Sequence, residues 1–353
     1  MTSDNAIIIC SECFHDQGLR LDAEQLGIIE DSACPSCGKI TGHKLNKNHL
    51  NILAYRYFVW GSLLKLDYGG APTVQFNEHQ KTDISMPSWL RNDVKLIERH
   101  LGVGFFLYGP HPWMLGDITP LRLLKKRGPD KKIIHRIINE YPLRVIEEKD
   151  IFYRVRKFPK NPEQRFEYDS PPEDLVGKGR LDSTELPVLY ASSDLNICIH
   201  ECRITAEDDL YVATLSPTSS LRLLDVSALL THETVAPYES LDLAVNMLFL
   251  AGAHSYPLSR KIAMAACYAG FDGLVFPSYF SLLRTGTMPF QTSYGLPNRY
   301  FKELHDYEQS RTIPNLALFG RPVKEGKVNV RCINRLILRK VDYGFHFGPV
   351  GMS

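Results

Sequence analysis

The sequence lacks several features that would assign it to a special class of protein. It has 41 Lys and Arg against 40 Asp and Glu, and the formal net charge of +1 gives no reason to expect a polyanionic partner for the whole molecule. The first residues, MTSDNAIIICSEC, lack the basic segment and long apolar core of a secretory signal. The most apolar stretch, residues 243–253, is too short to span a bilayer. We therefore expect a cytoplasmic protein that has no membrane anchor.

Internal repeats and a phosphate-binding loop are also missing from the pattern. The GVGF segment at 102–105 has too few glycines, at the wrong spacing, for a phosphate loop. The hydrophobic share of 44% and charged share of 23% are those of an ordinary globular protein. At 353 residues the chain is long enough for two domains, or for one domain with a sizeable attachment.

Four of the eight cysteines form two pairs near the N-terminus. Cys10 and Cys13 make one CxxC pair, Cys34 and Cys37 the other, and 20 residues separate the pairs. This spacing suits four thiolates around one tetrahedral Zn²⁺. Two disulfides are the alternative, which the absence of secretory features disfavours. Because four sulfurs close the coordination shell, we expect a structural Zn²⁺ in a zinc ribbon.

The role of the ribbon remains open on sequence grounds. Such ribbons contact nucleic acid, contact proteins, or brace a small fold that lacks a core of its own. The other cysteines, Cys198, Cys202, Cys267 and Cys332, are predicted to be small buried hydrophobic residues.

Hydrophobic periodicity predicts three parts: a zinc ribbon at 1–44, a helical domain at 45–147 and an α+β domain at 148–345. In the second part, helical spacing runs through 49–66, 86–102 and 130–146. The basic run at 125–132, KKRGPDKK, is predicted to be a solvated loop, with nucleic-acid contact as the lesser alternative. In the third part, strands are predicted at 151–158, 188–190, 210–216, 221–227, 273–278, 315–319 and 328–341, and helices from residue 195, over 239–254 and over 259–269.

The stretch VLYASSDLNICIHECRI at 188–204 places an acid beside a buried helix face. It reads as a strand, a Ser-Ser-Asp cap and an amphipathic helix. At 100° per residue the face that must be buried comprises Leu195, Cys198, Ile199 and Cys202. Glu201 lies at the edge of that face and is expected to be half sheltered from solvent.

A set of polar residues could converge near this helix. Its members occupy strand ends, a glycine turn and the helix itself: Arg154, Arg180, Tyr190, Glu201 and Ser278. Strand ends and the helix starts that follow them are where clefts open in such folds. Two guanidinium groups suit phosphate, an aromatic ring stacks on a base, and a carboxylate can stabilise positive charge on an anomeric carbon. Each residue also has a plain structural alternative, as a surface charge, a core or turn residue, or an ion-pair partner.

The order of these segments resembles the RES domain family. The matching stretches are FYRVR, GKGRLDSTELPVLYASSDLNICIHE, DGLVFPS and NLALF, which lie in the C-terminal half of the chain. The family is named for an arginine, a glutamate and a serine, which correspond here to Arg154 or Arg180, Glu201 and Ser278. The resemblance implies a fold similar to ADP-ribosyltransferases and NAD-binding bacterial toxins. It also implies NAD hydrolysis, NAD phosphorolysis or ADP-ribosylation, often in a toxin that a small antitoxin inhibits.

The resemblance further implies a binding role for four residues. Arg154 and Arg180 should hold the pyrophosphate of NAD and the nearby ribose. Tyr190 should line the nicotinamide side of the pocket, and Tyr153 is a further candidate wall residue. The family commonly has an aromatic residue and Asn after the second arginine, whereas here Leu181 and Asp182 follow.

Glu201 and Ser278 receive the chemical roles in this assignment. Glu201 should bind the nicotinamide ribose and stabilise its oxocarbenium-like transition state. Ser278 should complete the pocket by hydrogen bonding and not as a nucleophile, because no obvious base accompanies it. We expect Glu201→Ala or Arg180→Ala to abolish turnover and leave the fold intact. The segment 279–314 is either a lid over the substrate or a peripheral insertion.

The helical part resembles the HEPN-like domains that precede some RES domains. An HEPN nuclease signature has an arginine, a polar residue, and a histidine six residues after the arginine. Arg91-Asn92 begins in this way, but residue 97 is Ile and the next histidine is His100. A second nuclease is therefore not expected. This part should control the RES domain or mediate assembly, with a regulatory partner or a homo-oligomer as the candidates.

These observations together predict an NAD-consuming enzyme that cleaves the nicotinamide–ribose bond, with water or phosphate as acceptor. Depletion of NAD would make it a toxin or defence effector. One alternative is transfer of ADP-ribose to a protein or nucleic acid. The other is a module that binds nucleic acid through the zinc ribbon and carries an inert RES pocket.

Overall fold

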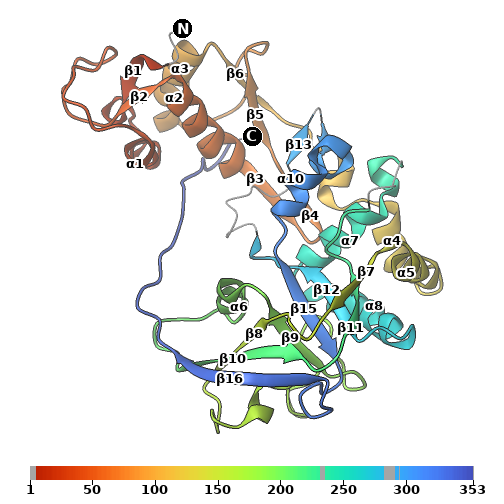
Figure 1. The fold of residues 1–353 in the computed structure, drawn as a ribbon. Coiled ribbons are helices and arrows are strands. Elements are labelled where there is room, and N and C mark those ends of the chain that lie inside the picture. The colour runs from red at the N-terminus through yellow and green to blue at the C-terminus, as the bar shows by residue number, and fades with distance from the viewer. Residues whose placement is uncertain (1–4, 231–234, 282–290, 294, 353) are drawn as a thin grey trace. The chain divides into compact units, whose positions relative to one another are not determined.

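The chain forms two compact units (Figure 1). The computed structural model describes residues 5–230, 235–281, 291–293 and 295–352. Unit 1 consists of Met1–Lys65, Gly70–His111 and Asp342–Ser353, and unit 2 of Leu66–Gly69 and Pro112–Val341. The division into three parts, with boundaries at residues 44 and 147, stays a prediction.

Unit 1 mixes short strands with helices. Its elements are β1 (Ile7–Cys10), α1 (Gln17–Leu26), β2 (Lys44–Asn46), α2 (Lys47–Ala54), the π-helical turn η3 (Tyr55–Val59), η4 (Trp60–Ser62), β3 (Leu63–Leu66), β4 (Gly69–Pro72), β5 (Val74–Asn77), α3 (Arg91–Leu101) and β6 (Gly104–Leu107). Strand β1 pairs with β2, and β5 with β6, both antiparallel. The last residues of β3 and the first of β4 lie where the chain passes between the units.

Side-chain caps and one apolar core account for the helices of unit 1. The Asp16 carboxylate accepts a hydrogen bond from the Leu19 amide at the start of α1, and Asn46 caps α2 in the same way. Gly102, with φ +73°, ends α3 in the left-handed conformation. The core that these helices share includes Leu19, Leu50, Leu53, Phe58, Val94, Ile97 and Phe105. The helix predicted over 86–102 is thus confirmed, whereas the one over 49–66 gives way to β3 at Leu63.

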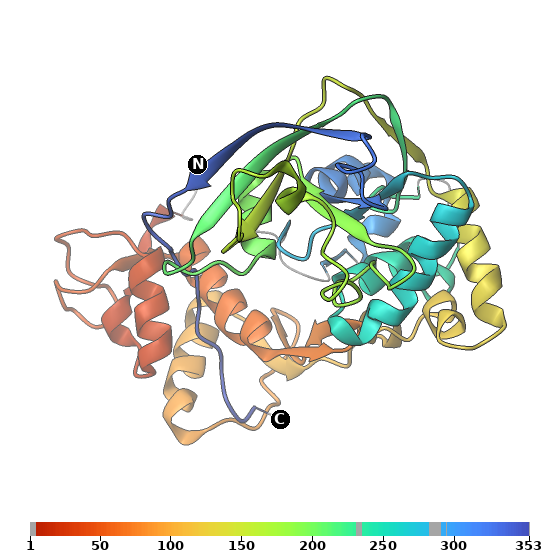
Figure 2. The ribbon, with the colours of Figure 1, turned by 90° about the horizontal axis from the view of Figure 1, so that it is seen from below.

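Unit 2 is built on one mixed sheet of eight strands. In sheet order these are β16 (Val328–Leu336), β10 (Leu210–Pro217), β8 (Phe152–Lys157), β9 (Val188–Ser192), β15 (Pro314–Phe319), β12 (Gly273–Pro277), β11 (Leu221–Asp225) and β7 (Leu143–Ile146). Neighbours are antiparallel except for β11 and β12, which are parallel. Figure 2 shows β16 running along β10 as an edge strand. The α+β class and the predicted strands are confirmed, except that the strand expected over 328–341 ends at Leu336.

Helices accompany this sheet, and the connection between its parallel strands contains two of them. The helices of unit 2 are α4 (Thr119–Leu124), α5 (Pro129–Glu140), α6 (Leu195–Glu201), α7 (Leu241–Leu250), α8 (Tyr256–Tyr268) and α10 (His305–Ser310). The chain passes from β11 through α7 and α8 to β12, as a parallel pair requires. Gly270, with φ +84°, follows the end of α8. A small pair, β13 (Thr292–Ser293) and β14 (Leu296–Pro297), precedes α10.

The two faces of β8 contact different cores. Phe152 belongs to the larger core, together with Leu189, Val275 and Leu316. Val155 belongs to a smaller core with Cys198, Leu210 and Val212. Because side chains alternate along a strand, Phe152, Arg154 and Arg156 share one face of β8, and Tyr153 and Val155 share the other.

Some sequence predictions are wrong in detail. The region 45–147 contains the strands β3 to β7 and is not largely helical. The helix expected over 130–146 ends at Glu140, because Pro142 and the extended β7 follow.

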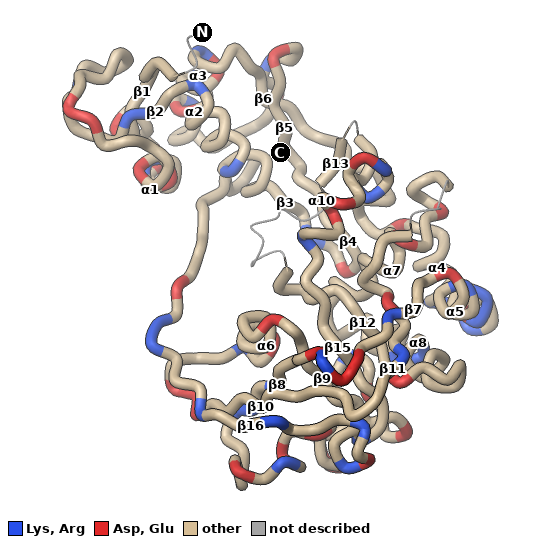
Figure 3. Tube along the Cα trace, in the orientation of Figure 1, with Lys and Arg blue, Asp and Glu red and all other residues tan. Residues whose placement is uncertain are grey.

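Cys332 lies exposed on the edge strand and is not a buried residue. The basic run at 125–132 follows α4 and includes the first turn of α5 (Figure 3), where Asp130 pairs with Lys261 at 2.7 Å. Among the described residues, no helix is both long and apolar enough to cross a membrane.

Candidate active site and metal site

The Glu201 carboxylate is held by two side chains from other strands. Its Oε1 accepts hydrogen bonds from the Ser278 hydroxyl and from Nδ2 of Asn315, each at 2.6 Å. Ser278 is fully buried and Asn315 is 5% exposed, whereas Glu201 itself is exposed and not half sheltered as expected. Oε2 accepts no hydrogen bond from the described residues. One carboxylate oxygen is therefore anchored, and the other can meet a ligand.

The sheet topology explains why these three residues meet. Strand β15 lies between β9 and β12 and runs antiparallel to both, so the ends of β9 and β12 flank the start of β15. Asn315 at that start lies opposite Ser192 and Phe276. Ser278 directly follows β12, and α6 directly follows β9 and carries Glu201 at its last position.

Local interactions fix the helix that presents Glu201. Asp194 caps α6, because its carboxylate accepts hydrogen bonds from the amides of Asn196 and Ile197. The Cys198 thiol lies 3.2 Å from the Tyr153 carbonyl oxygen and anchors the helix on β8. Burial raises the pKa of Cys198 to about 12, which keeps this thiol protonated and able to donate. Ile197, which the predicted buried face omitted, is fully buried.

The Ser278 hydroxyl makes two hydrogen bonds. Its hydroxyl donates to Glu201 and accepts from the Phe280 amide at 3.1 Å. The Ser278 hydroxyl and the Asn315 amide donate to the same oxygen of Glu201. Ser278 therefore helps to position this carboxylate. The pocket-completing role of Ser278, by hydrogen bonding and not as a nucleophile, stays a prediction.

Arg154 lies deep in unit 2, at the line where β8 and β9 separate. The two strands pair only at Tyr153 and Ser192, and Nη1 of Arg154 donates to the Tyr190 carbonyl oxygen beyond that point. Arg154 is 5% exposed, its Nε has no hydrogen-bond partner among the described residues, and burial lowers its pKa. A buried donor without a partner is costly, so this nitrogen is a candidate for contact with a bound anion. Its pyrophosphate role stays a prediction.

Arg180 makes several contacts with the segment that ends α7. Its guanidinium group donates to the carbonyl oxygens of Leu248 (3.3 Å) and Ala251 (2.7 Å) and to Ser255 Oγ (3.2 Å). It also lies over the Tyr256 ring, 4.9 Å from the centroid. Burial lowers the pKa of Arg180, while the negative charge of Glu201 acts in the opposite sense, which puts the two groups within electrostatic reach.

These contacts change the expected result of removing Arg180. Arg180→Ala leaves carbonyl oxygens at a helix end without their donor, so we expect the free energy of unfolding to fall by about 1–3 kcal/mol. The earlier expectation of an intact fold is thus replaced by one of a weakened fold. Thermal unfolding without ligand measures the effect, with Lys178→Ala as the control because Lys178 is an exposed residue of the same turn. Equal melting temperatures for both variants would contradict this account.

The turn that carries Arg180 depends on Asp182 and Tyr190. The Tyr190 hydroxyl accepts from the amides of Leu181 (2.7 Å) and Asp182 (3.1 Å) and donates to Asp182 Oδ1 at 3.0 Å. The Tyr190 ring also packs edge-on against Phe276. The Asp182 carboxylate therefore fixes the conformation of this turn. Asp182 differs from the residue that the family commonly has at this position. Tyr153 lies half-buried beside the smaller core. The substrate contacts predicted for both tyrosines stay predictions.

Sequence reasoning missed two features near Glu201. Asn315 stood within the quoted NLALF segment, and the available signal was one amide side chain at the head of an otherwise apolar strand. His200, next to Glu201, stacks on Phe280 at 5.7 Å between ring centroids and 17° between planes. The segment 279–314, expected to be a lid or a peripheral insertion, includes Phe280 and α10, and its residues 282–290 and 294 lie outside the described residues.

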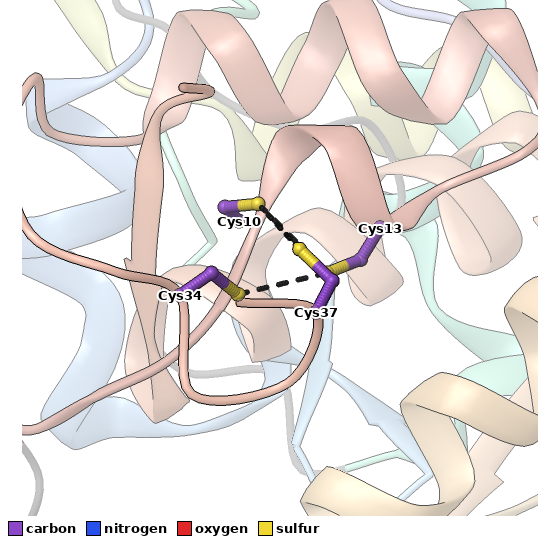
Figure 4. A group of neighbouring side chains, drawn as sticks. All are labelled: Cys10, Cys13, Cys34 and Cys37. Carbon is purple, nitrogen blue, oxygen red and sulfur yellow. Dashed lines mark hydrogen bonds between the residues drawn. The ribbon is translucent and has the colours of Figure 1, made fainter. Parts of the chain in front are cut away.

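The four N-terminal cysteines come together as predicted (Figure 4). Their Sγ atoms all lie within 4.8 Å of one another, at 3.8 Å for Cys10–Cys13, 3.6 Å for Cys10–Cys37 and 3.7 Å for Cys13–Cys34. Four sulfurs at about 2.3 Å from one tetrahedral Zn²⁺ stand about 3.8 Å apart, so the arrangement fits this ion. The cysteines are free thiols and form no disulfide. This cluster could hold a metal ion, and its spacing suits Zn²⁺.

The second knuckle also favours a thiolate. Burial alone would raise the pKa of Cys34, but hydrogen bonds from the amides of Cys37 and Ser36 outweigh it and lower this pKa to about 7. The Gly38 amide closes the knuckle on the Cys34 carbonyl oxygen at 2.8 Å, and Gly38 has φ +76°. Lys44, fully buried, donates to the carbonyl oxygens of residues 40–42 and supports the loop that follows.

Comparisons with known proteins give a family match over part of the chain. No curated protein matches it. A chain in the solved structure titled "Crystal structure of the M.tuberculosis MbcT-MbcA toxin-antitoxin complex" is similar at 15% identity and a TM-score of 0.30, over 59% of this chain and 93% of that chain. The family model described as the RES domain matches residues 151–285. These residues hold Arg154, Arg180, Tyr190, Glu201 and Ser278, and Asn315 lies beyond them. Residues 151–285 therefore resemble a RES domain.

Proposed function

We propose that the RES domain binds NAD and cleaves the bond between nicotinamide and its ribose. The observation that carries this proposal is the Glu201 carboxylate, anchored through Oε1 by Ser278 and Asn315 within electrostatic reach of Arg180. As the bond breaks, its electron pair moves to the pyridinium nitrogen, and nicotinamide leaves as a neutral base. Positive charge develops on the anomeric carbon, and a fixed carboxylate stabilises it.

Water or phosphate is the proposed acceptor. Its oxygen forms the new bond to the anomeric carbon and its proton is released, which yields ADP-ribose or ADP-ribose 1″-phosphate. We assign the pyrophosphate and its ribose to Arg154 and Arg180, and the nicotinamide side to Tyr190 and Tyr153. The unpaired Nε of Arg154 supports its share of this assignment. Depletion of NAD would make the protein a toxin or defence effector, with an inhibitory antitoxin as the partner to be sought.

Product analysis distinguishes the acceptors. Purified protein is incubated with NAD, with and without phosphate, and the products are separated by chromatography. Free ADP-ribose under both conditions identifies water, and ADP-ribose 1″-phosphate identifies phosphate. Label from NAD that remains attached to a protein or nucleic acid would instead identify a transferase. Steep salt-dependent binding of nucleic acid without loss of NAD would favour a binding module.

Removal of either anchor of Glu201 should lower turnover without weakening substrate binding. We expect Ser278→Ala and Asn315→Leu each to reduce kcat about 10- to 100-fold with little change in KM, because the carboxylate position matters most in the transition state. The double variant should lose less than the product of the two single losses, since both bonds hold one oxygen. Asn329→Leu, at an exposed site on β16, is the control. A rise in KM at constant kcat would contradict the positioning role.

A further inference from the structure

The last twelve residues of the chain, Asp342–Ser353, belong to unit 1 and are here called the tail. Strand β16 of unit 2 ends at Leu336, and the tail reaches the helices of unit 1 (Figure 1). The Phe347 amide donates to Oδ2 of Asp22 at 3.0 Å, and Phe347 and Met352 pack against the core of unit 1. The tail thus contributes both a backbone contact and apolar surface to a unit formed mostly by the first 111 residues.

The Asp22 carboxylate is the hydrogen-bond acceptor for the backbone of the tail. It lies on α1, is fully buried, and its other oxygen, Oδ1, has no hydrogen-bond partner among the described residues. Burial raises the pKa of Asp22, and the Phe347 amide and Arg56 act in the opposite sense. A carboxylate in such surroundings is costly unless it is bound. The Phe347 amide supplies a hydrogen bond to one of its two oxygens, Oδ2.

Two glycines of unit 1 admit the tail at close range. A Cβ on Gly18, within α1, would lie 2.8 Å from Cβ and Cγ of Phe347. A Cβ on Gly61 would overlap Gly348 and lie 2.8 Å from Pro349 Cδ. The three atoms nearest to that Cβ all belong to the tail, and Gly61 does not have a positive φ.

The tail has its own matching glycine. A Cβ on Gly348 would meet the Gly61 Cα at 2.5 Å. Each residue of the segment Phe347–Pro349 has a feature that suits unit 1. Phe347 supplies a ring, Gly348 has no side chain at the close contact, and the φ angle of Pro349 is fixed. By contrast, Tyr343 near the start of the tail is 84% exposed. Unit 1 therefore contacts the short segment Phe347–Pro349, whereas the residue Tyr343 on its N-terminal side stays in solvent.

The attachment of the tail makes it an intramolecular ligand. Residues 337–341 form no helix or strand, and Ile337 is 75% exposed. A segment joined by so short a connection has a high effective concentration at its binding site, which can reach the millimolar range, roughly, for flexible linkers. Contacts of modest intrinsic strength would then suffice to keep it bound.

We propose that unit 1 carries a peptide-recognition site for an extended Phe-Gly-Pro segment, and that the tail occupies this site in cis. Asp22 binds the backbone amide of the phenylalanine, Gly18 accommodates its ring, and Gly61 admits the glycine. A partner that engages this site in trans must present the same three residues and displace the tail. This inference concerns unit 1 and does not rest on the activity proposed for the RES domain.

The test uses the full chain with a site-specific protease sequence inserted between Val341 and Asp342. After folding and cleavage, size-exclusion chromatography with mass analysis shows whether the tail remains bound. We expect the tail to be retained, and to exchange with an excess of a fluorescent synthetic peptide of residues 342–353. Immediate loss of the tail, with no binding of the peptide, would overturn the proposal.

Substitutions in the synthetic peptide and in the protein distinguish specific recognition of the tail from nonspecific binding. Phe347→Ala or Gly348→Ala in the synthetic peptide should weaken its binding to the cleaved, unaltered protein at least 10-fold, whereas Tyr343→Ala should not. Because these changes are made in the peptide alone, misfolding of the protein cannot explain them. Gly61→Ala in the protein should weaken binding of the unaltered peptide to a similar extent. Equal binding of all three peptide variants would overturn the proposal.

Discussion

Glu201→Gln is expected to lower the rate of nicotinamide release from NAD about 100- to 1,000-fold. The change removes the negative charge that faces the developing cation, and fixed electrostatic groups of this kind are worth about that much in other enzymes. Gln keeps an oxygen that can accept from Ser278 and Asn315, so both anchoring hydrogen bonds can persist. Nicotinamide release is measured by chromatography at saturating NAD.

The control for this substitution is Glu207→Gln. Glu207 is exposed and lies six residues further along the chain, beyond the end of α6, so its neutralisation should leave the rate unchanged. The melting temperature of Glu201→Gln should match that of the unaltered protein, because the carboxylate of this exposed residue is not part of a core. Full activity in Glu201→Gln would show that the carboxylate is not the catalytic group.

Removal of zinc is expected to have the largest effect on the stability of unit 1. We predict one Zn²⁺ per chain, and we expect Cys13→Ser or a strong chelator to unfold the ribbon, because metal binding supplies folding free energy to such small segments. Cys10 lies next to Ile9, and Phe14 next to Cys13, and both neighbours are buried in the core of unit 1, so the loss should spread to α1. Metal analysis and thermal unfolding measure both parts of the prediction.

Cobalt provides an independent readout of the four-sulfur site. Co²⁺ bound by four thiolates in a tetrahedron should show intense absorption from ligand-to-metal charge transfer, and Cys13→Ser should weaken it. Cys332→Ser is the control, because Cys332 is exposed on β16 and outside the cluster. Isolation of the protein without metal, with the cysteines paired as disulfides, would contradict the zinc assignment.

Local patterns were sufficient to predict most strands and several helices of unit 2, although not α4, β7 or α10. The buried strands β9, β12 and β15 are short apolar runs bounded by turn residues or caps, and α6 follows an aspartate cap. Such signals involve neighbours in sequence, and a single chain displays them fully. The same holds for the cysteine cluster, where the CxxC spacing itself predicted the geometry.

Contacts between distant segments could not be predicted in the same way. Nothing in the spacing indicates that Asn315 reaches a residue 114 positions earlier, because that contact depends on β15 lying between β9 and β12. The tail is a second example, since its partner Asp22 stands 325 positions away. Likewise, the sequence offered Arg180 as a ligand for phosphate, and its bonds to the end of α7 became apparent only in the fold.

The decisive experiment for Glu201 as the catalytic group compares nicotinamide release from NAD by the purified full chain and by Glu201→Gln under identical conditions. We predict continuous release by the unaltered protein, with ADP-ribose or its 1″-phosphate formed in equal amount, and little release by the variant. Consumption of NAD at equal rates by both proteins would contradict the role of Glu201. Absence of release by the unaltered protein, with water, phosphate and macromolecular acceptors all supplied, would contradict the proposed function itself.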